Sequence, residues 1–194
     1  MDLKTTLNKF SIDKEQVYSE WIQWATMYSE KLEEVMECAF NGNDKERKRA
    51  SWILHHVSDR RPEVFYVKEK MMIDQLKRTE TQAEIRFILR YYSKYRLPRH
   101  QEREGLLTDY CFNVLMTPHD SVAPRVYSMS VLHKLAMRYP ELAHELETSI
   151  RWALENGSAG MISRGNKILK DSKINYIEAN TLEEAANKAV AALK

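Results

Sequence analysis

The 194-residue chain is long enough for one domain that buries about 70% of its unfolded surface. Its 30 lysines and arginines are nearly balanced by 28 aspartates and glutamates, and the formal net charge of +2 argues against binding of polyanions through overall charge alone. No apolar run reaches the roughly 18 residues of a membrane span, and residues 1–11 lack the apolar core of a signal peptide. We therefore expect a cytoplasmic protein that does not bind membranes.

The first predicted unit covers residues 13–43 and contains two amphipathic helices. A stripe with the spacing i, i+3, i+4, i+7 indicates the first helix and consists of Trp21, Trp24, Ala25 and Tyr28. The second helix has a similar stripe, made of Leu32, Val35, Met36 and Ala39. We expect this helix to end at Asn41-Gly42-Asn43 because these residue types favour turns.

Three further units, over residues 44–78, 81–117 and 120–156, repeat one another. The stripe of Ala50, Ile53, Leu54 and Val57 recurs 35 residues later as Ile85, Ile88, Leu89 and Tyr92, and after 78 residues as Ser128, Val131, Leu132 and Leu135. A proline follows each stripe, at Pro62, Pro98 and Pro140. Proline fits the first turn of a helix and disfavours helical geometry in the residue before it. Each proline is therefore expected to end one helix and open the next.

The end of the chain is predicted to contain a last unit and a cap. Residues 157–173 continue the repeat, and Gly157 and Ser158 suit a helix end and a helix start. Thr181 and Glu184 have the spacing of a capping box, which predicts a capping helix over residues 181–194. Because periods of about 20 to 50 residues indicate stacked units, we expect one domain over residues 1–194.

Helix pairs of this length with an intervening proline resemble HEAT repeats, and Tyr139-Pro140-Glu141-Leu142 is the nearest local likeness. The resemblance implies an all-α fold, a right-handed solenoid of antiparallel helix pairs. It also implies a distant fold-level likeness to alkylation-repair DNA glycosylases, which use a basic groove, an aspartate and neighbouring tryptophans. We find no tryptophan–aspartate cluster of that kind in this sequence.

Charge is distributed unevenly along the chain. Residues 44–103 contain 16 basic and 9 acidic side chains, whereas residues 1–43 carry a net charge of −4 and residues 104–156 a net charge of −3. The candidate sites for binding an anion or a partner are the six basic residues of the densest segment: Arg86, Arg90, Lys94, Arg96, Arg99 and Arg103. The first three are spaced by four residues and form one helical ridge. Of the aromatic side chains among them, we expect Tyr91 and Tyr95 to be accessible. A competing expectation is that Glu84, Glu102 and Glu104 neutralise this ridge.

Arg47 and Arg125 recur at matching positions of two units, where pairing with a carboxylate of a neighbouring repeat is the expected role. The likeness to the glycosylases, which use an aspartate, implies that the isolated acids near aromatic residues merit inspection, namely Asp59, Asp74 and Asp109, although we assign no catalytic residue.

No metal site is expected, because the six histidines form no HExxH or Cys/His metal spacing. Cys38 and Cys111 lie within helical stripes and are expected in the core. The glycines between residues 157 and 165 precede a helix but lack the Gly-Lys-Ser/Thr ending of a phosphate-binding loop.

Two functions from different classes follow. The leading interpretation is a non-enzymatic scaffold in which the second helices of the units line a concave surface that binds a protein partner. The alternative is a nucleic-acid-binding protein related to the alkylation-repair glycosylases. Other enzymes, including HEAT-like bilin lyases, stay open, but no residue here points to them, and we expect no cofactor.

Overall fold

The computed structural model describes residues 2–10, 15–79, 81–117, 121–155 and 157–171, and within these ranges the chain forms ten α-helices, two 3-10 helices and no strand. The elements in chain order are α1 (Leu3–Lys9), α2 (Glu15–Met27), α3 (Ser29–Asn41), α4 (Asp44–Arg60), η1 (Pro62–Lys68), α5 (Glu69–Leu76), α6 (Gln82–Lys94), α7 (Gln101–Met116), α8 (Val122–Arg138), η2 (Pro140–Leu142), α9 (Ala143–Glu155) and α10 (Ala159–Asp171). The all-α fold predicted from the sequence is thus confirmed.

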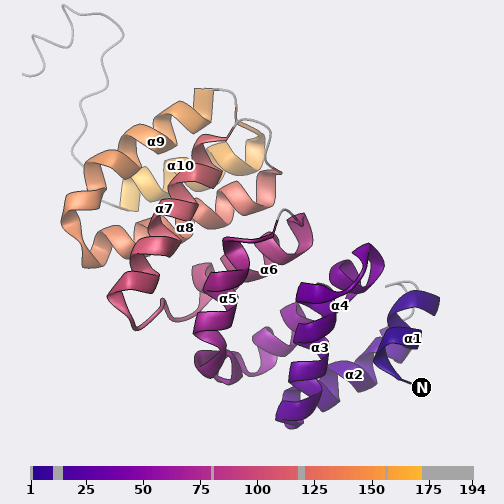
Figure 1. Ribbon diagram of the computed structural model, residues 1–194. Helices are drawn as coiled ribbons and strands as arrows, with labels where there is room; N and C mark the ends of the chain where they lie inside the picture. The colour runs from indigo at the N-terminus through magenta and orange to yellow at the C-terminus, as the bar shows by residue number, and fades with distance from the viewer. Residues whose placement is uncertain (1, 11–14, 80, 118–120, 156, 172–194) are drawn as a thin grey trace, which may run out of the picture.

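The helices stack in two layers along the solenoid. In the first layer, α2, α4, α6, α8 and α10 each contact the next member, and in the second layer α5 contacts α7 and α7 contacts α9. Figure 1 shows the chain advancing from α1 at the lower right to α9 and α10 at the upper left. The sequence analysis did not predict α1, a short helix that packs on α3 and α4 and buries Leu3 and Leu7. Each helix therefore has its neighbours mainly within its own or the adjacent unit.

Two of the three prolines open a new helix as predicted. Pro62 and Pro140 occupy the first turn of η1 and η2, directly after α4 and α8 end. Pro98 differs, because it lies in the connection between α6, which ends at Lys94, and α7, which begins at Gln101. The fixed backbone angle of proline suits a helix, and the N–H groups of the first turn have no acceptor within the helix. The missing N–H of Pro62 and Pro140 therefore costs these helices no hydrogen bond.

The predicted stripes form the core. Ile53, Leu54, Leu89, Leu132 and Leu135 are at most 1% exposed. This confirms that the first-helix stripes were assigned in the correct register.

The stripe predicted for the first unit is wrong at one end. Tyr28 is 48% exposed because it lies at the break between α2 and α3. The buried face of α2 instead begins one turn earlier, at Tyr18. The hydroxyl of Tyr18 donates a hydrogen bond to the carbonyl of Phe10 at 2.7 Å.

Arg47 links three consecutive units through a buried polar network. Its guanidinium donates to the carbonyls of Gly42 at 3.0 Å and Phe40 at 3.3 Å, near the end of α3. It also reaches α6, where Nη1 lies 3.5 Å from a carboxylate oxygen of Glu84, a fully buried side chain. The Gln75 amide of α5 donates to the other Glu84 oxygen at 2.5 Å. The expected pairing with a carboxylate of the neighbouring repeat is therefore found for Arg47.

Arg125, the second recurring arginine, has a different main partner. Its Nε and Nη2 donate to the carbonyl of Leu115 at 3.2 and 3.0 Å. Leu115 lies in the last turn of α7, whose final carbonyls have no partner within the helix. Both arginines thus donate to carbonyl groups at the end of the helix that precedes their own, α3 for Arg47 and α7 for Arg125. The sequence pattern alone did not reveal this shared role.

The predicted capping helix over residues 181–194 and the last two residues of the unit 157–173 lie outside the described residues.

We predict that Arg47→Met strongly destabilises the fold. Removing the guanidinium leaves the buried Glu84 carboxylate without its cation, which costs roughly 3 kcal/mol of unfolding free energy. Lys45→Met is the matched control, because Lys45 is an exposed residue of the same helix. Urea unfolding followed by circular dichroism measures both variants, and equal stabilities would contradict the structural role of the network.

Candidate functional surfaces

The three basic residues of the predicted ridge lie along α6, and two of them share Asp59 of α4 as their partner. Nη2 of Arg90 donates to both Asp59 oxygens, at 2.9 and 2.6 Å. Nζ of Lys94 and the hydroxyl of Tyr95 donate to one of these oxygens at 2.9 and 2.7 Å. Arg86 is exposed and has neither an ion pair nor a side-chain hydrogen bond with any described residue.

These contacts control the ionisation of Asp59. Burial alone would raise the pKa of Asp59, but the hydrogen bonds from Arg90, Lys94 and Tyr95 outweigh it and hold the pKa well below the usual 3.8. Asp59 is therefore ionised at neutral pH, where it accepts hydrogen bonds from cationic side chains and has no proton to donate.

The remaining three basic residues lie elsewhere in the fold. Nη1 of Arg103 pairs with Glu69 at 2.9 Å, and the backbone N–H of Arg99 donates to the other Glu69 oxygen at 2.9 Å. The guanidinium of Arg96 lies over the ring of Tyr66, 3.9 Å from its centroid. Asp59 therefore contacts two of the six residues, and Glu69 and Tyr66 contact three others.

Two details of the sequence-based picture need correction. Tyr91 is only 2% exposed, since its ring packs against Phe65 and its hydroxyl donates to the carbonyl of Pro62 at 2.9 Å. The acids expected to neutralise the ridge are also different. Glu84 pairs with Arg47, and Glu104 accepts from Arg138 and from the hydroxyl of Tyr139. Asp59 pairs with two residues of the ridge instead, and Glu69 pairs with Arg103.

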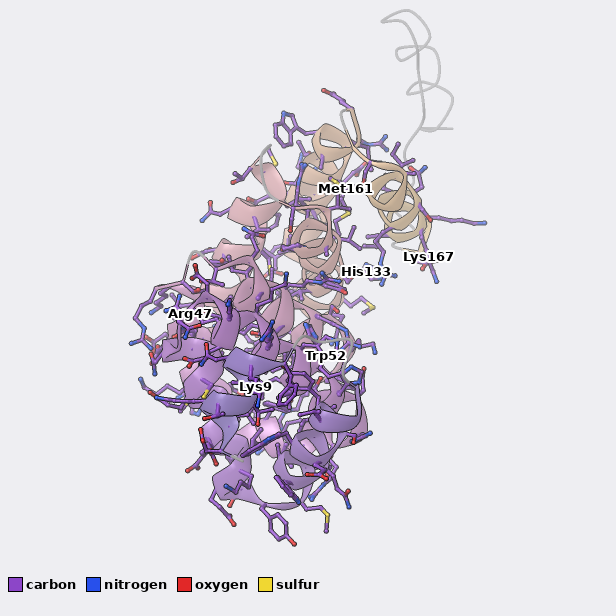
Figure 2. All side chains as sticks on the ribbon, turned by 90° about the vertical axis from the view of Figure 1, so that its right-hand side faces the viewer. Lys9, Arg47, Trp52, His133, Met161 and Lys167 are labelled. Carbon is purple, nitrogen blue, oxygen red and sulfur yellow. The ribbon has the colours of Figure 1, made fainter. Side chains whose placement is uncertain are left out.

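A groove of about 710 Å³ opens between α4 and α6 and is called the first-layer groove below. Its walls come from two helical faces and the start of α8: Asp44, Lys48, Ser51, Trp52, His55, His56, Asp59, Thr81, Gln82, Ala83, Arg86, Arg90, Ser121 and Tyr127. In Figure 2, Trp52 points to the same side of the solenoid as His133 of α8 and Lys167 of α10, away from Arg47. Sequence reasoning found the basic residues of α6 but missed the α4 residues that line the other side of the groove. The distance between α4 and α6 depends on how two units stack, which the sequence does not show directly.

Aromatic contacts hold Trp52 in this groove. Its indole lies 4.1 Å from the imidazole of His56 and 5.8 Å from the ring of Tyr18, measured between ring centroids. Trp52 and Asp59 line the same groove, although no tryptophan–aspartate cluster was predicted from the sequence. The tryptophan's neighbours are aromatic rings, and the aspartate's are cations.

His55 is neutral at physiological pH. Burial, followed by the positive charges of Arg90 and Arg86, lowers the pKa of His55 from 6.5 to about 3. The imidazole packs edge-on against Phe87, with 5.5 Å between ring centroids. Its Nδ1 is buried without a hydrogen-bond partner, as are Oγ of Ser51 and Nη1 of Arg90 in the same groove.

A second groove of about 690 Å³ lies between α3 and α5 and is called the second-layer groove. Its α3 wall is an acidic ridge at the spacing i, i+3, i+4, i+7, made of Glu30, Glu33, Glu34 and Glu37. Lys68 of η1 pairs with Glu33 at 2.5 Å, whereas Glu30 and Glu37 form no ion pair with a described residue. Met71 of α5 lines the opposite wall and is 44% exposed.

The other catalytic candidates do not converge on a site. Asp74 pairs with Lys70 on its own helix, and Asp109 is exposed on α7. Cys38 and Cys111 are buried free thiols whose pKa values burial raises to about 11 and about 12. Among the described residues no group of three or more His, Cys, Asp or Glu side chains is arranged to hold a metal ion.

Stacked helix pairs, with grooves between neighbouring helices of each layer, define the class of this protein as an α-solenoid. A family model described as a HEAT repeat domain matches residues 3–172, and the chain belongs to this family. This confirms the resemblance inferred from the repeated stripes. Comparisons with curated proteins and with solved structures give no match. In the described part of the chain, no helix has the length and apolar character needed to span a membrane.

We predict that His55 makes the fold sensitive to acid. The His55 imidazole takes up a proton near pH 6.5 in the unfolded chain but only near pH 3 in the folded chain. As the pH is lowered from 6.5 towards 3, the unfolding free energy therefore falls by up to about 1.4 kcal/mol per pH unit. His55→Gln should flatten that part of the stability–pH profile. Nuclear magnetic resonance of the imidazole should show the neutral form of His55 at pH 5, and a midpoint near 6.5 would refute the prediction.

Proposed function

We propose that this HEAT-repeat protein is a non-enzymatic scaffold and that its second-layer groove binds a basic segment of a protein partner. The observation that carries the proposal is the acidic ridge of α3, which faces exposed apolar side chains across the groove. HEAT repeats form extended surfaces on which a partner contacts several units. The described residues offer no convergent catalytic set that would favour an enzyme.

Electrostatics favour a cationic ligand for this groove. Glu30 and Glu37 are exposed and have no paired cation among the described residues, so they present negative charge to solvent. Lys68 and Arg78 lie on the opposite side, where Lys68 is already paired with Glu33. Arg78 donates to the neutral Gln75, so its charge offsets only one of the two unpaired glutamates. A lysine- or arginine-rich segment would complement the remaining charge and associate faster because of it.

Apolar contacts would supply affinity beside the charges. Met71 lines the groove, and Val67 on the neighbouring η1 is 84% exposed. Methionine adapts its shape to an apolar partner because its chain is unbranched and flexible. We therefore infer that the partner segment carries at least one apolar side chain between its basic residues.

The ion pairs of the basic ridge weigh against the nucleic-acid alternative. Asp59 engages Arg90 and Lys94, and Glu69 engages Arg103. Cations that are already paired release fewer counterions from a phosphate backbone, and counterion release supplies most non-specific affinity for nucleic acids. Of the six candidate residues, Arg90, Lys94 and Arg103 are therefore proposed to be engaged within the fold. The other three, Arg86, Arg96 and Arg99, form no ion pair with a described residue.

Site-specific crosslinking tests the protein partner. A photoreactive amino acid at position 71 should crosslink a protein from the native cell extract, and mass spectrometry should place the crosslink in a basic segment. Glu30→Lys with Glu37→Lys should abolish the crosslink by reversing the groove's charge. Glu145→Lys with Glu155→Lys is the matched control, since both residues are exposed on α9. Equal crosslinking in both double variants would refute this groove as the binding surface.

A salt titration tests the alternative. We predict no retention of duplex or single-stranded nucleic acid at about 50 mM salt, because two of the three ridge cations are already engaged by Asp59. Retention with a steep salt dependence that Arg90→Ala and Lys94→Ala flatten would instead favour nucleic acid as the partner.

A further inference from the structure

The first-layer groove contains buried hydrogen-bonding atoms that the protein itself leaves unsatisfied. Oγ of Ser51, Nη1 of Arg90 and Nδ1 of His55 are buried without a hydrogen-bond partner, and all three residues line this groove. Ser51 is only 1% exposed. Buried polar groups are ordinarily paired, and one that is not carries a desolvation cost that a bound ligand can remove. The set thus points to a ligand rather than to a structural role.

The chemistry of these atoms specifies an acceptor-rich ligand. The Arg90 nitrogen can only donate, and the serine hydroxyl can donate as well as accept. Neutral His55 supplies one further donor or acceptor according to its tautomer. Oxygen atoms of an anionic group match this arrangement.

The charge of the groove also favours an anion. Lys48 of α4 and Arg86 of α6 are exposed, and neither forms an ion pair with a described residue. Asp59 is engaged by Arg90 and Lys94, which leaves Asp44 as the other acid on the lining. Gln82 and Ala83 place the first turn of α6 at the groove, where helix N–H groups and the macrodipole attract negative charge.

The same groove offers aromatic surface. Trp52 and Tyr127 both line it and are partly exposed. An indole held by neighbouring rings provides a rigid platform on which a flat ring can stack. The groove volume of about 710 Å³ is that of a typical small-molecule site, for which roughly 300–1,000 Å³ is usual.

We propose that the first-layer groove binds a phosphomonoester that carries a flat ring, the chemistry of a nucleoside monophosphate. The phosphate contacts Lys48, Arg86 and the first turn of α6, and the ring stacks on Trp52. This site is independent of the second-layer groove, so either proposal can fail without the other. A free nucleotide and the phosphorylated end of an oligonucleotide share this chemistry, and the experiment separates them.

Isothermal titration calorimetry of the full chain tests the site with four probes. These are adenosine 5′-monophosphate, inorganic phosphate, adenosine, and a single-stranded oligoadenylate of ten nucleotides with a 5′-phosphate. We expect one monophosphate per chain, bound at least about tenfold more tightly than inorganic phosphate or adenosine, because stacking and charge act together. Equal or tighter binding of the oligonucleotide would overturn the free-nucleotide assignment.

Variants locate the bound molecule. Arg86→Gln should weaken adenosine 5′-monophosphate about tenfold through the lost charge-assisted hydrogen bonds, and it should leave adenosine unaffected. Trp52→Leu should reduce the advantage over inorganic phosphate, with circular dichroism as the check that the variant folds. Lys170→Gln is the matched control, since it removes an exposed charge from α10, which does not line the groove.

Two results would overturn the proposal. One is the absence of monophosphate binding at millimolar concentration by the wild-type chain. The other is binding that Arg86→Gln and Lys170→Gln weaken to the same extent, since the affinity would then reflect overall charge. Arg86→Gln alters an exposed side chain, so the test does not depend on a destabilised fold.

Discussion

Three buried carboxylates along this solenoid take their cation from another unit. Glu84, Glu69 and Glu104 are buried, and they pair with Arg47, Arg103 and Arg138 respectively. Leaving any of these charges unpaired in the interior would cost several kcal/mol. Such pairs can form only when neighbouring units meet in one relative position. The ion pairs therefore fix the stacking that apolar stripes, which tolerate some sliding, would leave loosely defined.

The two grooves arise from the same stacking. Asp59, which lines the first-layer groove, pairs with Lys94, 35 residues further along the chain. Glu33 and Lys68, also 35 residues apart, both line the second-layer groove and pair with each other. Each groove is therefore lined by a residue whose ion pair spans one repeat. Lys48 and Arg86 lack such a contact in the described structure, which is why charge is left over for a ligand.

The helices and their core stripes could be predicted because a period of 3.6 residues and the prolines at 62 and 140 are local signals. The accessibility of Tyr91 could not. A first helix such as α6 packs against its neighbours in the same layer and also against the segments that follow the first helices. Tyr91 of α6 is buried on this second face, where its ring contacts Phe65 of η1. The partners of the basic residues also escaped prediction, since Asp59 approaches Arg90 only after two units have stacked. Sequence thus located one wall of the candidate site but not the site.

Arg103 and Glu104 are adjacent in the chain but form their pairs in opposite directions. Arg103 reaches back to Glu69, and Glu104 accepts from Arg138 further along, each across 34 residues. Each of these two ion pairs joins neighbouring units, and both span the same number of residues along the chain. A gene duplication that copied one such unit in frame would copy both Arg103 and Glu104. Solenoids of this kind can lengthen during evolution without the invention of a new interface.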